Sequence, residues 1–290
     1  MTRVLIIGGD GLLGRALRSR LVADGIEVIA TSRRADAEFR VDLAGEPDRW
    51  PGFPAVDAAV LCAAVTSLAA CRADPVGTAR VNVRATAEVA RRLVAVGALP
   101  LLLSSTQVFD GSEPRCRTQD RPRPVTEYGR QKAAAEAEVL GLGGAVVRLS
   151  KVLEGSAALL RDWAVRLRRG EPIVPFSDMT LAPISPPFAV GLIRSVVTKR
   201  VHGILHGSGD SDVSYAVMAG RLAAAVGADP RLVRPESARE TRPDLESVPV
   251  WSSLAMGQAE SQLGWEPQSS AAVIDAACAE AAASSSPSHG

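Results

Sequence analysis

The sequence predicts an α/β fold in which a doubly wound parallel sheet carries a smaller C-terminal lobe. Three observations support this prediction. Up to residue 149, buried-strand runs alternate with helical patterns, which is typical of a parallel sheet covered by helices on both faces. The first of these runs ends in a turn with three glycines. Beyond residue 150 the pattern becomes irregular and rich in proline, which indicates a second lobe.

Length and composition narrow the functional class. The 290 residues suffice for one large unit at 1–150, a lobe at 151–283 and a serine-rich disordered tail at 284–290. A formal net charge of +1 gives no electrostatic basis for binding nucleic acid or a membrane. Four scattered cysteines and three histidines predict neither disulfides nor a metal site. Without a signal sequence or a membrane-length apolar run, we expect a cytoplasmic protein.

The first strand, at residues 4–7, runs into the glycine turn and then into a helix whose apolar residues recur with helical spacing. Glycines let a pyrophosphate approach the N–H groups of a helix N-terminus, so this unit predicts a Rossmann-type nucleotide site. Two registers fit, one starting at Gly8 and one at Gly9, and an ordinary strand–helix turn is the alternative. The candidate pyrophosphate residues are Gly8, Gly11, Leu12, Leu13 and Gly14.

The second strand, at residues 26–30, ends in Thr31-Ser32-Arg33-Arg34. An acidic residue at this place holds the ribose of NAD, whereas an arginine accommodates the 2′-phosphate of NADP. Ser32 and Arg33 are therefore candidate cofactor residues, and NADP is favoured over NAD. A solvated loop pair is the alternative, and the nearby Asp36 supports NAD.

Two further strands are expected to contribute to the nucleotide site. A short strand at 39–43 ends in Asp42 and Leu43, where Asp42 faces the adenine or serves only in a turn. A strand at 56–64 ends in Ala63 and Ala64, whose small side chains leave room for a cofactor or for close helix packing. A long helix follows at 75–96, and its Asn82 lies on a buried face and must find a partner.

The remaining chain supplies polar groups at strand ends and a series of helices. A strand at 99–103 is followed by Ser104-Ser105-Thr106, a loop at 110–126, a helix from 127 and a strand at 145–149. Beyond these we expect an arginine-rich helix near 161–169 and helices at 188–199, 211–226 and 252–263. A strand at 202–206 and a last alanine-rich helix complete the prediction.

Tyr128 and Lys132 are four residues apart, so on a helix they share one face. A free phenol has a pKa of about 10, and a nearby cation lowers it, which makes such a tyrosine a usable general acid or base. An exposed tyrosine beside a solvated lysine is the alternative.

These motifs together resemble an extended short-chain dehydrogenase/reductase. The residues that carry this resemblance are Gly8-x-x-Gly11-x-x-Gly14, the strand-end Ser105 and Tyr128-x-x-x-Lys132. Residues 103–111, Leu-Ser-Ser-Thr-Gln-Val-Phe-Asp-Gly, resemble the strand-end signature of the dTDP-4-dehydrorhamnose reductase family. Segments 63–66, 71–75 and 81–83 resemble that family at corresponding places, and the similarity covers residues 1–153.

The resemblance implies a chemical role for three residues. Tyr128 protonates a carbonyl oxygen as hydride arrives, Lys132 holds the nicotinamide ribose and tunes Tyr128, and Ser105 hydrogen-bonds the carbonyl. Thr66, Thr106 and Gln107 are candidate substrate residues. Sugar dehydratases carry an Asp-Glu pair where this chain has Thr106 and Gln107, which disfavours dehydration.

We therefore expect an NADPH-dependent reductase of a keto group on a nucleotide-activated sugar or a similar polar small molecule. The family has an aromatic-rich segment where this chain reads Leu-Ser-Lys-Val-Leu at 149–153. That departure motivates one alternative, a non-catalytic NADP-binding regulatory subunit. A nucleotide-sugar epimerase is another, and we also consider a homodimer.

Overall fold

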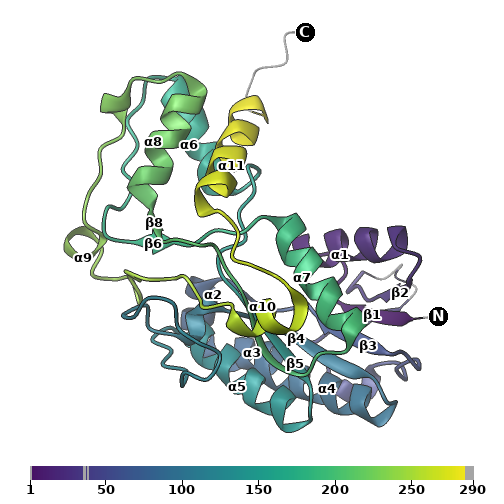
Figure 1. Ribbon diagram of the computed structural model, residues 1–290. Coiled ribbons are helices and arrows are strands. Elements are labelled where there is room, and N and C mark those ends of the chain that lie inside the picture. The colour runs from purple at the N-terminus through teal and green to yellow at the C-terminus, as the bar shows by residue number, and fades with distance from the viewer. Residues whose placement is uncertain (1, 35–36, 38, 285–290) are drawn as a thin grey trace.

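A six-stranded parallel sheet forms the centre of the computed structural model, which describes residues 2–34, 37 and 39–284. Its strands follow the order β2-β1-β3-β4-β5-β7, so the chain reverses direction across the sheet between β1 and β3 (Figure 1). Ligands bind at such reversal points in open α/β sheets. The strand bounds are β1 Arg3–Ile7, β2 Glu27–Ala30, β3 Ala58–Leu61, β4 Leu99–Ser105, β5 Ala145–Leu149 and β7 Gly203–Gly207.

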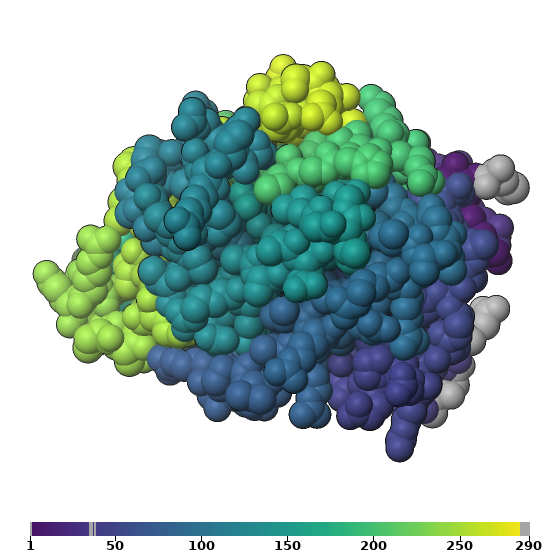
Figure 2. Space-filling model, turned by 90° about the horizontal axis from the view of Figure 1, so that it is seen from below, coloured from purple at the N-terminus to yellow at the C-terminus, as the bar shows by residue number. Residues whose placement is uncertain are grey.

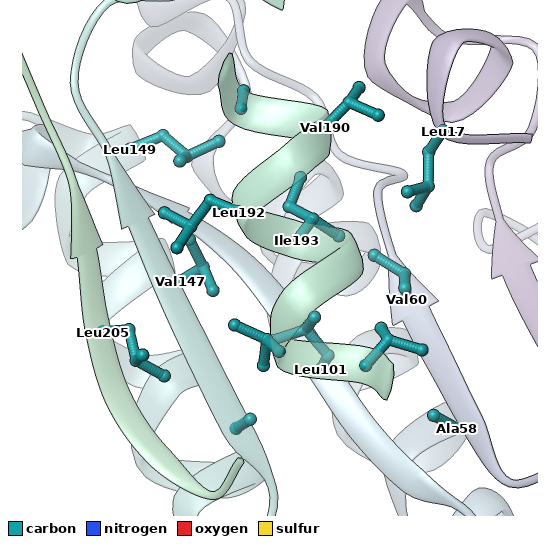
Figure 3. Packing of buried hydrophobic residues seen from close by; sticks show 14 of the residues in the cluster. Leu17, Ala58, Val60, Leu101, Val147, Leu149, Val190, Leu192, Ile193 and Leu205 are labelled. Carbon is teal, nitrogen blue, oxygen red and sulfur yellow. The ribbon is translucent and has the colours of Figure 1, made fainter. Parts of the chain in front are cut away.

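Helices cover both faces of the sheet. On one face, α1 (Leu12–Ala23) and α7 (Pro186–Lys199) pack side by side, with α10 (Gly257–Leu263) beyond them. Figure 3 shows the α7 side chains Val190, Leu192 and Ile193 seated on the apolar residues of four strands. On the other face lie α4 (Thr86–Ala95) and α5 (Glu127–Gly141), whose surface forms the blue-to-teal centre of Figure 2. These two layers confirm the predicted doubly wound fold.

The second lobe has its own apolar core, made by three helices. They are α6 (Ala158–Arg168), α8 (Tyr215–Val226) and α11 (Ser270–Ser284), and the strands β6 (Thr180–Leu181) and β8 (Val213–Ser214) pair beneath them (Figure 1). On α6, Arg166 donates to the Pro172 carbonyl and Arg168 donates to the Ala282 carbonyl. Short helical segments complete the chain: η1 Pro47–Arg49, η3 Thr106–Val108, η4 Pro230–Leu232 and α9 Ala238–Thr241.

The sequence-based boundaries place the division between the lobes at residue 150, but part of the chain beyond that residue returns to the main sheet. Helix α7 and strand β7 belong to the main sheet, because β7 pairs with β5 along its whole length. The chain thus enters the second lobe after β5, returns to the sheet, and leaves again after β7. Helix α11 ends at Ser284, the first residue of the expected tail, and residues 285–290 lie outside the described part of the chain.

Two predicted elements differ in the structure. Residues 39–43 form no strand, because only Ser32 and Arg40 pair there, at the edge beyond β2. Val41 and Leu43 are nevertheless buried against the sheet, which explains the apolar pattern. The predicted helix 75–96 is continuous but contains a π-helical segment at Arg80–Ala85, between α3 (Pro75–Ala79) and α4, and a short helix α2 (Leu68–Ala73) precedes it.

Among the described residues, no helix combines the length and the apolar character needed to cross a bilayer.

Candidate active site

A cleft of about 640 Å³ lies where the carboxyl ends of the central strands meet the second lobe. Its size is typical of a small-molecule site. The main-sheet side is lined by the α1 turn and the ends of β3, β4 and β5, and the lobe side by residues of three separate segments. The lobe-side lining residues are Met179, Thr180, Leu181, Tyr215, Ser247, Pro249, Trp251 and Ser252.

The glycine turn builds the floor of this cleft. Gly8 has a φ of +88°, and a Cβ on Gly14, which both registers share, would lie 2.3 Å from the Gly8 carbonyl oxygen. A Cβ on Gly9 would lie 2.8 Å from the Ala30 Cβ, so the backbone needs glycine at the first position of either register. Gly11 differs, because its φ of −70° suits any residue and a Cβ there would meet only the Gly8 oxygen, at 3.5 Å. Its missing side chain leaves space in the cleft itself.

Helix α1 begins at Gly11 without a side-chain cap, and the cleft is lined by its first three residues, Leu12, Leu13 and Gly14. The first N–H groups of a helix have no partner within the helix and carry its positive dipole end. An uncapped helix start beside a space without a Cβ fits a dinucleotide pyrophosphate. Gly8 and Ala63 lie beneath the turn in close contact and do not line the cleft.

The end of β2 carries an acidic neighbour that the sequence prediction missed. The Ser32 hydroxyl donates to the carboxylate of Asp10, which comes from the glycine turn, and accepts from the Arg34 N–H at 3.0 Å. Arg33 is exposed beside it. A cation and a carboxylate therefore both lie at the place where the cofactor ribose is expected. Asp36, the residue held to support NAD, lies outside the described residues.

Asp42 and Leu43 lie away from the cleft. The Asp42 carboxylate accepts from the Ala44 N–H at 3.1 Å, and its carbonyl accepts from the Trp50 indole at 2.8 Å. These contacts correspond to the turn interpretation of Asp42. Leu43 lines a second hollow, of about 730 Å³, between the 45–48 segment and α4.

Asn82 holds the segment after β3 in place. Its side chain accepts from the Val65 N–H at 2.7 Å, donates to the Val65 carbonyl at 2.9 Å and donates to Gln131 at 2.8 Å. The buried Asn82 side chain thus has hydrogen-bond partners, as its predicted position on a buried face requires, and its bond to Gln131 connects it to α5. This network positions Ala64 and Thr66, which line the cleft.

Strand β4 and helix α5 bring the candidate catalytic residues together. The Ser105 oxygen accepts from the Gln107 N–H at 3.2 Å, which leaves its O–H free to donate into the cleft. Thr126 caps α5 by accepting from the Gly129 N–H at 3.0 Å. A Cβ on Gly129 would lie 2.0 Å from the Gln107 carbonyl oxygen, so this glycine lets α5 approach the end of β4. Tyr128, beside it, therefore lines the same cleft as Ser105, Thr106 and Gln107.

The electrostatics of Tyr128 differ from the expectation. Burial raises the pKa of Tyr128 to about 12, with no lowering by Lys132, because desolvation of the phenolate dominates. Lys132 is only 2% exposed and lies behind the cleft lining. Burial lowers the pKa of Lys132 to about 8, and the Glu136 carboxylate opposes that shift. The phenol is therefore protonated at neutral pH.

A buried ion pair fixes α5 to the sheet one turn beyond Lys132. Arg148 on β5 donates to Glu136 at 2.7, 3.0 and 3.1 Å, and both side chains are almost fully buried. Burial and the charge of Arg148 lower the pKa of His206 to about 4, so its ring is neutral. Arg148 also stacks over Phe109, a cleft residue, at 5.1 Å.

The cleft thus contains ten of the predicted site residues: Gly11, Leu12, Leu13, Gly14, Ala64, Thr66, Ser105, Thr106, Gln107 and Tyr128. Sequence reasoning missed Cys62, Phe109, Lys151, Tyr215 and Trp251. Phe109 and Lys151 lie in segments that the family resemblance already drew attention to, at 103–111 and 149–153, whereas no local motif marks Cys62, Tyr215 and Trp251. Within the described residues no group of three or more metal-ligating side chains occurs.

Comparisons with known proteins agree with this geometry. The β subunit of methionine adenosyltransferase 2 from Bos taurus is 30% identical over 80% of this chain and 75% of its own. The dTDP-4-dehydrorhamnose reductase of Mycolicibacterium smegmatis is 31% identical over 89% of this chain and 80% of its own. The solved dTDP-4-dehydrorhamnose reductase from Yersinia enterocolitica has a TM-score of 0.82 at 21% identity, covering 96% of this chain and 99% of that one.

A sequence model described as the RmlD substrate binding domain matches residues 1–282, nearly the whole chain. Both the glycine turn and the Ser105–Tyr128 constellation fall inside that match. The resemblance to an extended short-chain dehydrogenase/reductase of the dTDP-4-dehydrorhamnose reductase type is therefore confirmed, and the chain belongs to the RmlD substrate-binding domain family.

Proposed function

We propose that this protein is an NADPH-dependent reductase of a keto group on a nucleotide-activated sugar or a similar polar substrate. The observation that carries the proposal is the meeting of Ser105 and Tyr128 with the uncapped start of α1 in one cleft. The enzyme class follows from the family, whose relatives include named dTDP-4-dehydrorhamnose reductases.

The cleft residues have the protonation states that reduction needs. A bound nicotinamide cofactor would supply hydride. Tyr128, neutral at physiological pH, would donate a proton to the carbonyl oxygen, and Ser105 would donate a hydrogen bond to the same oxygen. Lys132, one helical turn beyond Tyr128 on α5, would hold the nicotinamide ribose, as the family resemblance implies. Thr66, Thr106 and Gln107 would contact the substrate.

The cofactor preference for NADP rests on Arg33 at the end of β2. A solved reductase from Bacillus anthracis with a TM-score of 0.80 contains NADP, whereas the similarly folded MoeE5 contains NAD. Both are less than 25% identical to this chain, so they support a nicotinamide dinucleotide without deciding between the two. Asp10, which contacts Ser32, would weaken binding of a 2′-phosphate by like-charge repulsion.

The test is substitution of Tyr128 by Phe. We expect NADPH affinity, measured by fluorescence titration, to stay within about twofold, and oxidation of NADPH with a panel of nucleotide 4-keto-sugars to fall at least about 100-fold. The chain has one other tyrosine, Tyr215, which lines the lobe side of the same cleft and provides the matched Tyr215→Phe control. Equal loss in both variants, or normal turnover in Tyr128→Phe, would refute the role of Tyr128.

A second function is favoured by the β-subunit relatives, which match this chain as well as the reductases do. In this alternative the protein binds NADP and regulates a partner enzyme without turnover. Reproducible co-purification of an enzyme whose activity depends on this chain, together with NADPH binding and no reductase activity, would support it. An epimerase, by contrast, would carry tightly bound nucleotide through purification and consume no NADPH.

A further inference from the structure

The charge distribution inside the cleft indicates what kind of substrate it accepts. Although 22% of the chain is charged, the 28 described residues that line the cleft include no carboxylate and a single charged side chain, Lys151. The remaining polar groups are uncharged: hydroxyls, the Gln107 amide, the Trp251 indole, the Cys62 thiol and backbone groups. A lone cation in a cleft whose lining has no carboxylate favours a ligand that places an anionic group beside it, either its diphosphate or a group on the sugar ring.

Lys151 is held on an ordered segment that connects the two lobes. Its carbonyl accepts from the Ile184 N–H at 2.9 Å, and the Leu153 N–H donates to the Ile184 carbonyl at 2.9 Å. Within the described residues, no ion pair is formed by the exposed Lys151 ammonium. The backbone is therefore fixed while the charged group is available to a ligand.

The strand register places Lys151 near the reacting end of the cleft. Leu149 pairs directly with Ser105 across β4 and β5, and Lys151 follows two residues later. With strands about 4.8 Å apart and a rise of about 3.3 Å per residue, the Lys151 backbone lies within about 10 Å of Ser105. Lys151 thus lies on the β4–β5 side of the cleft, where a sugar ring would present its carbonyl to Ser105, whereas α1 follows β1, which β3 separates from β4.

We infer that Lys151 forms an anion subsite which recognises a carboxylate carried by the sugar ring of the substrate. This inference rests on the proposed function and narrows it to acidic nucleotide sugars, such as those of the uronate class.

The experiment compares a charged and a neutral ligand of the same size. Wild type, Lys151→Met and Lys151→Arg, each saturated with NADP, are titrated with UDP-glucuronate, UDP-glucose and UDP by calorimetry. We expect wild type to bind UDP-glucuronate at least about tenfold more tightly than UDP-glucose, as for a charge-assisted hydrogen bond. Lys151→Met should lose that preference without a change in NADP affinity, and Lys151→Arg should retain it.

Three results would overturn the inference. The first is equal binding of UDP-glucuronate and UDP-glucose by wild type. The second is a preference for UDP-glucuronate that Lys151→Met retains. The third is a Lys151→Met variant whose affinity for UDP and UDP-glucose falls as much as its affinity for UDP-glucuronate, which would assign the lysine to the diphosphate. If no nucleotide ligand binds, free glucuronate and glucose are titrated instead. Glucuronate binding that depends on Lys151 then supports the subsite and refutes only the nucleotide part of the proposed function, whereas no such binding refutes the subsite.

Discussion

Substitution of Gly11 by alanine separates cofactor binding from folding. The Gly11 backbone is extended, and an added Cβ would meet only the Gly8 oxygen at an ordinary contact distance of 3.5 Å. Alanine is a poorer N-cap than glycine by up to about 1 kcal/mol, and the lower entropy of the unfolded chain, worth about 0.4–1 kcal/mol, offsets most of this loss. We therefore expect the free energy of unfolding of the unliganded protein to change by no more than about 0.5 kcal/mol.

Binding of NADPH should respond very differently. The methyl group would enter the space beside the free N–H groups of α1 and displace a pyrophosphate from two charge-assisted hydrogen bonds, each worth about 1.5 kcal/mol or more. A loss of about 3 kcal/mol corresponds to an affinity about 100-fold weaker. At an NADPH concentration 100 times the wild-type Kd, stabilisation by the ligand should fall from about 2.7 to about 0.4 kcal/mol.

The assay is chemical denaturation with and without NADPH, with fluorescence titration beside it. Two other glycines serve as controls. Gly14→Ala forces a Cβ against the Gly8 oxygen at 2.3 Å and should destabilise even the unliganded protein. Gly220→Ala, in α8 with open space around it, should alter neither binding nor stability by more than about 1 kcal/mol. Wild-type affinity in Gly11→Ala would refute the placement of the pyrophosphate at the start of α1.

Three further predictions follow from the charges around the cleft. Because burial lowers the pKa of Lys132 to about 8, its protonated form destabilises the unliganded fold below pH 8, and this cost disappears as pH rises toward 10.5. Lys132→Met should therefore stabilise the protein at pH 7 more than at pH 10.5, and this gain in the free energy of unfolding should differ by up to about 3 kcal/mol between the two pH values. A gain that is the same at both pH values would contradict the prediction. Glu136→Gln leaves Arg148 charged and buried, which should cost about 3–5 kcal/mol in urea denaturation, while the added change Arg148→Met should recover most of that loss. Asp10→Asn should strengthen NADPH binding about fivefold without strengthening NADH binding, since it removes a negative charge beside the expected position of the 2′-phosphate. Parallel changes in both affinities would place Asp10 away from the 2′-phosphate.

Local patterns in the sequence were enough to predict the main sheet and ten of the 28 residues that line the cleft. The run Val4–Ile7, the glycine turn and the helix that follows are consecutive, so their pattern alone specifies a strand–turn–helix unit. The same holds for Tyr128 and Lys132, which helical spacing places on one face. The strand predicted at 39–43 was wrong because an apolar edge segment can bury its side chains without forming a ladder.

The lobe side of the cleft could not be predicted, because its residues meet only through tertiary packing. Tyr215 and Trp251 come from segments more than 80 residues beyond Tyr128, and no short motif connects them. The Asp10–Ser32 contact spans 22 residues and depends on how the turn lies over β2. The sequence also predicted a lowered pKa for Tyr128 from the neighbouring Lys132, whereas burial raises it, because the pKa of a phenol depends on its desolvation as well as on a nearby cation.

The stripe on α5 formed by Tyr128, Lys132 and Glu136 favours one direction of proton transfer. Burial raises the pKa of Tyr128 to about 12, so in the unliganded protein the phenol is protonated at pH 7 and has a proton to donate. Glu136, neutralised by Arg148, still supports the charge on Lys132. Proton donation accompanies reduction of a carbonyl, whereas oxidation of an alcohol requires the phenolate. The protonated phenol is thus the form of Tyr128 that the proposed reduction would use.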